Sequence, residues 1–503
     1  MKRSQRVYLG VDLGASSGRA MLGVLQDHRL KIKEISRFPN APCQLAGRWS
    51  WNFPSLWNNI LIAMRRCAGQ GYDRLSGVGV DTWGADFGLL DGDGRLLADP
   101  VCYRDPMTDG VERWIDSAIG QEELYRLTGA PFTRVSTFSQ LVALGHGPTA
   151  DRLKSAQTLL MMPDLFRYSL CGHKAIELTA AGSSQLINIH SSRWCAKLFQ
   201  ALHLPRRIMP ELVRPATVVG HLSRTLAADT GLNRVPVVAV AGHDTASAAA
   251  AAPWAGEDAA FVSCGTWLVV GAVQDGPLTT PEALRRGFYN QLGLESVLVV
   301  KGMIGLYLFE HLYRALRRRN QAISYAQMLR EASQARPLSR FLDINWPAFF
   351  AVEDVKSSIA EFLRLTGQKA PRDRGSLIRT LLEGLAWGCR GAIQDLAALT
   401  GRTPRRISLV GGGARNAVLC QMIADATGLE VIAGPAEAAA VGNLAIQALA
   451  TGRLRKVADI RELVRSSFRL TKYQPRGIEL WNKHACQYQE VVERGAPARW
   501  TRC

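Results

Sequence analysis

The chain lacks the patterns that mark several large classes of protein. Its ten cysteines include no C-x-x-C pair, so neither a zinc ribbon nor a redox dithiol is indicated, and reduced thiols are expected. No apolar run approaches the roughly 20 residues that a membrane span needs. The apolar stretch after Arg6 is interrupted by Asp12 and is too short for a signal sequence. These absences predict a cytoplasmic protein with no membrane partner.

Acidic residues are scarce relative to basic ones. There are 43 Asp and Glu against 61 Lys and Arg, giving a formal net charge of +18. The excess is scattered along the chain, with no basic stretch interleaved with aromatics and no zinc-finger spacing, so nucleic acid is not the expected partner. One cluster, Arg317–Arg319, fits the last turn of a helix expected over 303–319. An anionic substrate or nucleotide would suit the surplus.

What the chain does contain is ordinary for a globular α/β enzyme. Apolar residues make up 47% and charged residues 21% of 503 residues, without a low-complexity tract. The length predicts more than one domain. Strands are expected at 7–11, 20–25, 30–38, 77–81, 237–241, 260–263, 267–273 and 407–410, and helices at 112–128, 303–319, 376–400, 416–427 and 434–452.

A strand, a turn of small residues and another strand occur twice, at 7–25 and at 260–273. The first copy continues into a third strand, which predicts an antiparallel meander. This recurrence suggests two like halves, and Pro and Gly interrupt the Ala-rich stretch near 251–256. We therefore expect one domain over residues 1–252 and a second over 253–503.

The first of these turns, Gly14-Ala15-Ser16-Ser17-Gly18, fits G-x-S-x-G, the pattern around a hydrolase serine. That pattern requires a helix after the serine, but the following segment favours a strand, so a nucleophilic Ser16 is not expected. The turn offers several N–H groups, two hydroxyls and the cation of Arg19, which suits phosphate oxygens. A plain hairpin turn is the alternative.

Asp12 ends an apolar run, where an uncompensated charge would be costly. Beside a phosphate site it favours Mg²⁺ held largely through water; otherwise it caps the turn. In His243-Asp244-Thr245, neighbours in sequence point apart, so a His–Asp proton relay is not expected. Asp244 is instead a candidate base for an alcohol, or the N-cap of the helix that follows.

Two further segments carry polar groups at strand ends. Asp81-Thr82-Trp83-Gly84-Ala85-Asp86 combines carboxylates with an indole, which suits a polyhydroxylated ligand, although a buried Trp beside hydrogen-bonded acids is equally compatible. Gly411-Gly412-Gly413 stands between a strand and a helix, where free N–H groups would face a ligand.

Taken together, these segments resemble the FGGY carbohydrate kinases, and within that family most closely its rhamnulokinase branch. The resemblance covers nearly the whole chain. It rests on VDLGASSGRAML (11–22), GVDTWGADFGLLD (79–91), PVCYRD (100–105), MPDLF (162–166), GHDTASA (242–248), SCGTW (263–267), LVGGGARN (409–416) and AGPAEAAAVGN (433–443).

The resemblance implies two ribonuclease-H-like domains flanking a deep nucleotide and sugar cleft, ATP and Mg²⁺ as cofactors, and phosphorylation of a ketose, with L-rhamnulose favoured, at its terminal hydroxyl. The base would be Asp244, and the metal would lie near Asp12 and Asp244. The sugar would meet Gly84, His243, Asp244 and Thr245. The nucleotide would meet Ala15, Ser16, Ser17, Gly18, Arg19, Thr266 and Gly412. The oligomeric state is left open.

The chain departs from the rhamnulokinase pattern where substrates are chosen. Gly302 stands where an Asn meets the sugar, Glu310 stands where a Gln meets ATP, and Asn290-Gln291-Leu292-Gly293 replaces Asn-Glu-Gly-Gly. A missing hydrogen bond is worth about 0.5–1.5 kcal/mol, enough to retune the preference among L-rhamnulose, L-fuculose, L-ribulose and D-xylulose. A non-enzymatic or chaperone-like ATPase on the same fold is the alternative class.

Overall fold

The structure is a computed structural model that describes residues 5–45, 47–147, 150–253, 258–318, 323–350, 352 and 354–496. The chain divides into two compact units, and neither is continuous in sequence. The first unit comprises Met1–Ala251, Gln274–Val299 and Ala438–Phe468, and the second comprises Ala252–Val273, Val300–Glu437 and Arg469–Cys503. Residues 254–257 of the expected boundary and Arg319 of the basic cluster lie outside the described residues.

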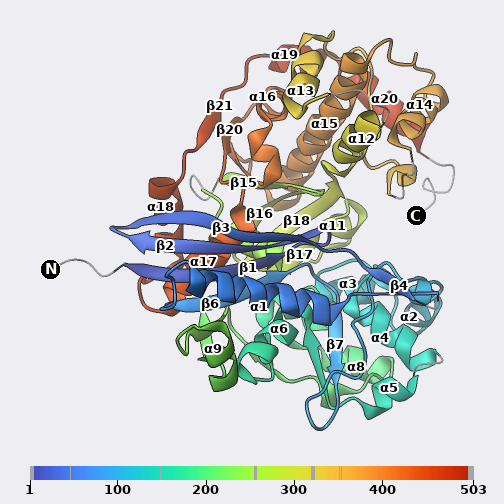
Figure 1. The fold of residues 1–503 in the computed structure, drawn as a ribbon. Coiled ribbons are helices and arrows are strands. Elements are labelled where there is room, and N and C mark those ends of the chain that lie inside the picture. The colour runs from blue at the N-terminus through green and yellow to red at the C-terminus, as the bar shows by residue number, and fades with distance from the viewer. Residues whose placement is uncertain are drawn as a thin grey trace. The chain divides into compact units, whose positions relative to one another are not determined.

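The first unit contains a six-stranded sheet with the order β13-β14-β6-β1-β2-β3 (Figure 1). The expected meander is confirmed, because β1, β2 and β3 pair antiparallel in sequence order. Beyond β1, β6 runs parallel to it, β14 runs parallel to β6, and β13 closes the edge antiparallel. The strands are β1 (Arg6–Leu13), β2 (Ser17–Gln26), β3 (Arg29–Pro39), β6 (Gly77–Thr82), β13 (Thr217–His221) and β14 (Pro236–Ala239).

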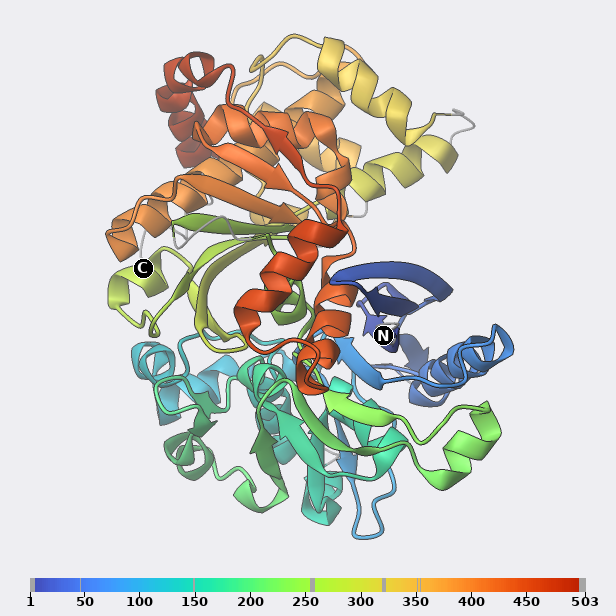
Figure 2. The same ribbon diagram turned by 90° about the vertical axis from the view of Figure 1, so that its left-hand side faces the viewer.

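Helices cover both faces of this sheet. On one face, Leu56 and Ile60 of α1 belong to the same apolar core as Leu9 and Val11 of β1. Because side chains alternate along a strand, the neighbours of those β1 residues point to the other face, where α17 and α18 pack on β1 and β3 (Figure 2). The helices are α1 (Phe53–Gly69), α9 (Arg224–Thr230), α10 (Asp244–Ala250), α17 (Ala438–Ala450) and α18 (Val457–Ser467).

A second core of the first unit gathers residues 87–209 with Leu292 and Val297. Its two-stranded ribbon joins β7 to β8, and β12 pairs with β9. Its main elements are β7 (Phe87–Leu90), α2 (Glu112–Ala118), α3 (Gln121–Thr128), α4 (Thr137–His146), α5 (Ala150–Ser155), β8 (Thr158–Met161), α6 (Met162–Cys171), β9 (Ala175–Glu177), α7 (Leu178–Gly182), α8 (Ala196–Ala201), β12 (Glu211–Val213) and β17 (Tyr289–Leu292).

The second sheet has the strand order β17-β18-β16-β15-β19-β20-β21, and its run β16-β15-β19-β20-β21 repeats the strand directions of β2-β1-β6-β14-β13 in the first sheet. β15 pairs antiparallel with β16 and parallel with β19, β20 continues parallel, and β21 ends antiparallel. The strands are β15 (Ala259–Cys264), β16 (Trp267–Gln274), β18 (Val297–Ile304), β19 (Arg406–Val410), β20 (Glu430–Ala433) and β21 (Thr471–Tyr473). The two like halves suggested by the sequence are therefore present.

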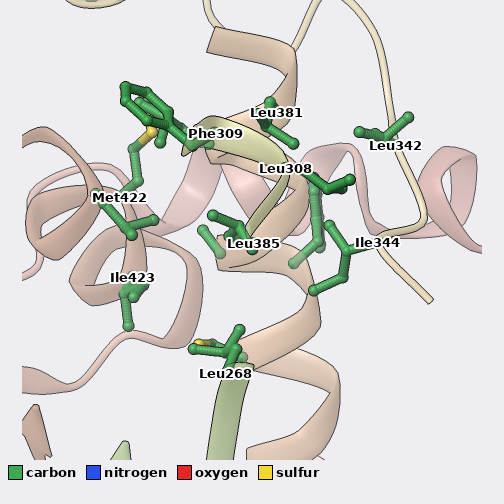
Figure 3. Packing of buried hydrophobic residues seen from close by; sticks show 14 of the residues in the cluster. Leu268, Leu308, Phe309, Leu342, Ile344, Leu381, Leu385, Met422 and Ile423 are labelled. Carbon is green, nitrogen blue, oxygen red and sulfur yellow. The ribbon is translucent and has the colours of Figure 1, made fainter. Parts of the chain in front are cut away.

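A helical layer packs on this second sheet. Leu268 of β16, Leu381 and Leu385 of the long helix α15, Phe309 of α12 and Ile423 of α16 belong to one apolar core (Figure 3). The helices are α12 (Tyr307–Arg318), α13 (Tyr325–Gln334), α14 (Val355–Leu365), α15 (Arg374–Thr400), α16 (Ala417–Thr427), α19 (Ile478–Lys483) and α20 (Ala485–Gly495). Among the described residues, no helix has the length and apolar character that crossing a membrane requires.

Three expected helices have different bounds in the structure, and the one expected over 434–452 is α17, which runs only from Ala438 to Ala450. The segment 112–128 is broken into α2 and α3, because Gly120 adopts a φ of 72° and begins the second helix. The helix expected from 303 starts at Tyr307, since β18 continues to Ile304. The expectation for 376–400 is confirmed by α15, whose N-cap Asp373 accepts from the backbone N–H of Ser376.

Candidate active site

The turn between β1 and β2 is the predicted glycine and serine hairpin. Gly14 donates its N–H to the carbonyl of Ser17 at 3.0 Å, and the side chain of Asn40 donates to the carbonyl of Gly14 at 2.7 Å. Ser16 is exposed at the tip. The segment after Ser16 is strand β2 rather than a helix, so the context of a hydrolase nucleophile is absent and the turn presents backbone and hydroxyl groups.

Two buried aspartates lie side by side below this turn. Asp12 on β1 and Asp81 on β6 are partners in the parallel register. Arg19 donates to Oδ2 of Asp12 from Nε at 2.9 Å and from Nη2 at 2.5 Å. Asp12, expected near the metal, and Arg19, expected near the phosphates, therefore contact each other. Asp12 forms an ion pair with Arg19 rather than only capping its turn.

The environment of Asp81 is more unusual. It is fully buried, Asn443 donates to its Oδ1 at 2.6 Å, and its Oδ2 has no hydrogen-bond partner among the described residues. Burial and the neighbouring Asp12 hold its pKa well above the usual range; Asn443 lowers it and Asp244 raises it further. Asp12, Asp81 and Asp244 thus share one electrostatic environment at the carboxyl ends of the strands.

Asp244 is the first residue of α10 and follows the loop after β14. The N-cap of α10 is His243, so the expectation of Asp244 as N-cap is wrong. Thr245 donates its hydroxyl to Asp244 Oδ1 at 3.2 Å. His243 Nε2 lies 3.6 Å from the same oxygen, closer than neighbours pointing apart would allow but beyond hydrogen-bond length. Burial lowers the pKa of His243, with Asp244 opposing.

Glu177, which the sequence did not single out, holds this loop in place. It is fully buried, and its Oε2 accepts from the N–H of Gly242 at 2.8 Å and from the hydroxyl of Thr179 at 2.6 Å. Its Oε1 accepts from the N–H of Thr179. Oε2 therefore fixes the backbone that leads into His243 and Asp244, while Oε1 caps the N-terminus of α7.

Gly84 lies against the same loop. A Cβ atom at this position would stand 3.0 Å from Oγ of Ser183 and 3.2 Å from Nε2 of His243. The structure therefore brings together Gly84 and His243, both expected to meet the sugar, and adds Ser183. The absence of a side chain at Gly84 leaves room beside His243.

The segment 81–86 contains a second buried acid, Asp86, whose partners are indole and amide groups. It is fully buried, and it accepts from the indole N–H groups of Trp51 at 2.6 Å and Trp83 at 2.9 Å. Gln140 donates to its other oxygen at 2.9 Å, and burial raises its pKa to about 6. Within this segment, the buried Trp beside a hydrogen-bonded acid describes Asp86, while Asp81 and Gly84 remain near the candidate site.

The corresponding turn of the second unit follows β15. Gly265 donates to the carbonyl of Trp267 at 2.9 Å and accepts from the N–H of Leu306 at 2.8 Å. Gly305 donates to the carbonyl of Thr266 at 3.1 Å, and a Cβ at Gly305 would lie 2.7 Å from the Gly265 carbonyl oxygen. Close backbone packing thus fixes the turn and leaves Thr266 exposed.

The glycine-rich loop after β19 packs on that turn. Gly411 has a φ of +84°, a conformation that favours glycine, and a Cβ there would lie 2.9 Å from the Cys264 carbonyl. A Cβ at Gly413 would overlap the Cys264 side chain, whereas one at Gly412 meets no atom within 4 Å. The loop therefore requires glycine on both sides of Gly412, and the space beside Gly412 itself is open.

The three departures from the family pattern have defined surroundings. Gly302 is exposed on β18, next to Lys301, which bonds Asp395 at 3.1 Å. Glu310 lies on α12, and with burial its charge raises the pKa of Tyr325 to about 12. Asn290 uses its amide within the first unit, accepting from Leu278 N–H at 2.7 Å and donating to the Gly129 carbonyl at 2.9 Å.

No group of three or more His, Cys, Asp or Glu side chains among the described residues has the arrangement of a direct metal site. A cation held largely through water does not require such an arrangement.

Comparison with known proteins assigns the family. The N-terminal domain model of the FGGY family of carbohydrate kinases matches residues 7–251, and the C-terminal domain model matches residues 260–451. A protein named Rhamnulokinase from Bacteroides thetaiotaomicron is 35% identical over 96% of this chain and 99% of its own length. One of the same name from Enterococcus faecalis is 33% identical over 99% of this chain and its full length.

Solved structures share the fold. A xylulose kinase from Rhodospirillum rubrum has a TM-score of 0.80 at 20% identity, covering 97% of this chain and 98% of that one. A gluconate kinase from Lactobacillus acidophilus has a TM-score of 0.79 at 15% identity, covering 97% and 96%. These similarities cover both halves of the molecule, and membership implies transfer of a phosphoryl group from ATP to a carbohydrate. The chain belongs to the FGGY family of carbohydrate kinases.

Proposed function

We propose that this kinase phosphorylates the terminal hydroxyl of a ketose, with L-rhamnulose as the substrate and L-rhamnulose 1-phosphate as the product. The observation that carries the proposal is the group of Asp12, Asp81 and Asp244 beside the glycine turn, with Gly84 and His243 next to Asp244. The names of the full-length relatives support the choice of sugar. A cytoplasmic setting, which supplies ATP, is part of the proposal.

In this proposal Asp244 accepts the proton of the attacking hydroxyl. Thr245 fixes one of its oxygens through a hydrogen bond, and Glu177 fixes the loop that precedes it. Because the transition state of phosphoryl transfer is loose, the base mainly orients the hydroxyl. Gly84, His243 and Thr245 would contact the sugar.

The nucleotide would be held by the turn of the first unit through the N–H and hydroxyl groups of Ala15–Gly18. Arg19, already bonded to Asp12, would add a positive charge near the phosphates. In the second unit, Thr266 and the open Gly412 would contact the nucleotide, and Glu310 would stand near it. N–H groups aimed at a phosphate stabilise negative charge without reorganising.

The first unit fits a divalent cation. Asp81 Oδ2 is a buried carboxylate oxygen without a hydrogen-bond partner among the described residues, and Asp12 and Asp244 add negative charge around it. Asp12 and Asp244 would hold Mg²⁺, largely through water. When bound, Mg²⁺ would neutralise charge on the phosphate oxygens. Arg19 would meanwhile keep Asp12 oriented.

Substrate choice is tested by measuring ADP release with Mg-ATP and L-rhamnulose, L-fuculose, L-ribulose and D-xylulose. We expect the highest kcat/KM with L-rhamnulose. A higher kcat/KM with another ketose would identify that ketose as the preferred substrate. Gly302, which offers no side-chain amide, is the position where such a difference would arise. ATP hydrolysis indifferent to every sugar would instead favour the chaperone-like ATPase.

A further inference from the structure

On the face of the first sheet that carries Asp12 and Asp81, three glycines leave space between the strands and α17. Gly10 on β1 and Gly77 and Gly79 on β6 point to the face that α17 covers. A Cβ at these glycines would lie 3.1, 2.9 and 3.0 Å from amide oxygens of α17. Strand residues two apart share a face, so the next positions after Gly10 and Gly79 on that face are Asp12 and Asp81.

The side-chain amides of Asn443 and Gln447, both on α17, fill this space beside the glycines. Asn443 donates from Nδ2 to Asp81 Oδ1 at 2.6 Å. The same Nδ2 lies 3.3 Å from the Gly79 carbonyl and 3.4 Å from the Val11 carbonyl. Gln447, one turn along the helix, donates to Asn443 Oδ1 at 2.7 Å and to the Leu9 carbonyl at 3.0 Å. Asn443 and Gln447 are both fully buried.

This chain of donors fixes the orientation of each amide. A carbonyl can only accept, so the Leu9 carbonyl requires the NH₂ group of Gln447 on its side. Gln447 then donates to Asn443 Oδ1, which leaves the NH₂ group of Asn443 for Asp81. The result occupies Asp81 Oδ1 and leaves Oδ2 without a hydrogen-bond partner among the described residues.

We infer that Asn443, oriented by Gln447, is a positioning residue that fixes the Asp81 carboxylate and reserves its Oδ2 for the water shell of the divalent cation. The inference rests on the function proposed above for the aspartates. Partners of this kind, one step removed from a metal, typically change metal affinity or activity about 10–100-fold when they are lost.

The test uses the full chain with ADP, and Mn²⁺ as a paramagnetic substitute for Mg²⁺, so that binding is read by electron paramagnetic resonance without turnover. We expect Asn443→Ala to weaken Mn²⁺ binding about 10-fold or more and to lower kcat, while the KM for the sugar stays within about two-fold. Thr451→Ala is the matched control. Thr451 follows the last residue of α17, and the substitution removes a hydroxyl that bonds Tyr8 at 2.9 Å, so it should leave Mn²⁺ affinity unchanged.

A double-mutant cycle with Asp81→Asn distinguishes positioning from general destabilisation. If Asn443 acts through Asp81, adding Asn443→Ala to Asp81→Asn changes Mn²⁺ affinity less than two-fold. The same loss in both backgrounds, or unchanged Mn²⁺ affinity in Asn443→Ala, would overturn the inference. Wild-type protein that binds no Mn²⁺ in the presence of ADP would overturn the proposed metal site itself.

Removing a buried amide can also prevent folding. Gln447→Met offers a second variant, because it keeps the length of the side chain but removes the donor that orients Asn443, without touching Asp81. A smaller loss of Mn²⁺ affinity in the same direction is expected. Folded Gln447→Met and Asn443→Ala proteins with wild-type affinity would both contradict positioning by this pair.

Discussion

In the first unit, β1 runs antiparallel to β2 and parallel to β6, and in the second unit β15 runs antiparallel to β16 and parallel to β19. In each, a turn of small residues follows the first strand. The residues that face each other across the parallel strands differ in chemistry between the two units. Asp12 faces Asp81 across the parallel pair of the first unit, whereas Ser263 faces Val410 in the second.

The difference divides the work between the two turns. The first carries titratable groups: Asp12 and Asp81, with Arg19, His243 and Asp244 around them. The second is built from backbone, and burial holds the pKa of its Cys264 thiol well above the usual range, so the thiol stays neutral. The same strand arrangement therefore carries charged side chains in one unit and closely packed backbone in the other, and under the proposed function these would serve proton and cation chemistry and nucleotide contact, respectively. Substitutions near the first turn should therefore mainly change catalysis, and substitutions near the second should mainly change stability and nucleotide binding.

The largest effect should come from the charge of Asp244. We expect Asp244→Asn to lower kcat by about 10²–10⁴-fold, because the amide cannot accept the proton of the hydroxyl. Neither turn loses a group that is proposed to contact the nucleotide, so the affinity for ADP measured by calorimetry without a divalent cation should stay within about three-fold of wild type. A variant with near-normal kcat would remove Asp244 from the role of base and weaken the division between the turns.

Backbone packing should dominate the second turn. Gly413→Ala places a Cβ 2.6 Å from Cys264 Cβ, and we expect it to reduce the free energy of unfolding by about 1–3 kcal/mol. Gly412→Ala is the matched control, because its Cβ meets nothing within 4 Å, so stability should change by less than about 0.5 kcal/mol. Denaturant unfolding compares the two variants.

The same Gly412→Ala protein also tests whether the nucleotide contacts this position. If the nucleotide lies over this position, the new methyl group raises the KM for ATP and leaves the KM for the sugar alone. An unchanged KM for ATP would remove Gly412 from the nucleotide site while leaving the packing argument intact.

A smaller effect, confined to the sugar, is expected at Gly84. Gly84→Ala adds a methyl group 3.0 Å from Ser183 Oγ and 3.2 Å from His243 Nε2. It should raise the KM for the sugar about ten-fold, the order of one methyl group in a fitted pocket, without changing the KM for ATP. Ser183→Gly in the same protein should restore part of the affinity. If the KM for ATP rises instead, Gly84 belongs to the phosphate side of the site.

Local patterns were sufficient for much of this architecture. The strands at 7–11 and 260–263, the hairpin turns and the glycine loop all follow from short-range composition, and the structure confirms them. A charge at the end of an apolar run requires a partner, and this pattern identifies Asp12 from the sequence. The same pattern holds for Asp81, but the residues around it in sequence point to a sugar ligand and give no sign of its pairing with Asp12.

The missing information is long-range. Asp81 and Asn443 are 362 residues apart in sequence, and Glu177 reaches Gly242 across 65 residues. No local period encodes such pairs. One signal was available, however: Gly10-Val11-Asp12 and Gly79-Val80-Asp81 repeat the same three residues. Two strands that end alike, each with glycine two residues before aspartate, indicate a shared glycine-cleared face and adjacent carboxylates.

The smallest expected effect is a pH dependence of stability that belongs to the first turn alone. Burial lowers the pKa of His243 in the folded protein, so the unfolded chain binds a proton at a higher pH than the folded chain. The contribution of His243 to the free energy of unfolding should therefore fall as the pH drops from about 7 towards 5, whereas Asp86 and Asp164, whose pKa values burial raises to about 6 and about 7, contribute in the opposite direction. His243→Gln removes only the His243 titration, so over the same interval its stability, measured by urea unfolding at each pH, should fall less or rise more than that of wild type. Gly412→Ala, in the unit whose turn has no titrating side chain in this range, should follow the wild-type slope. Parallel slopes for wild type and His243→Gln would mean that Asp244 offsets the cost of burial, and that the two turns differ less in charge than their residues suggest.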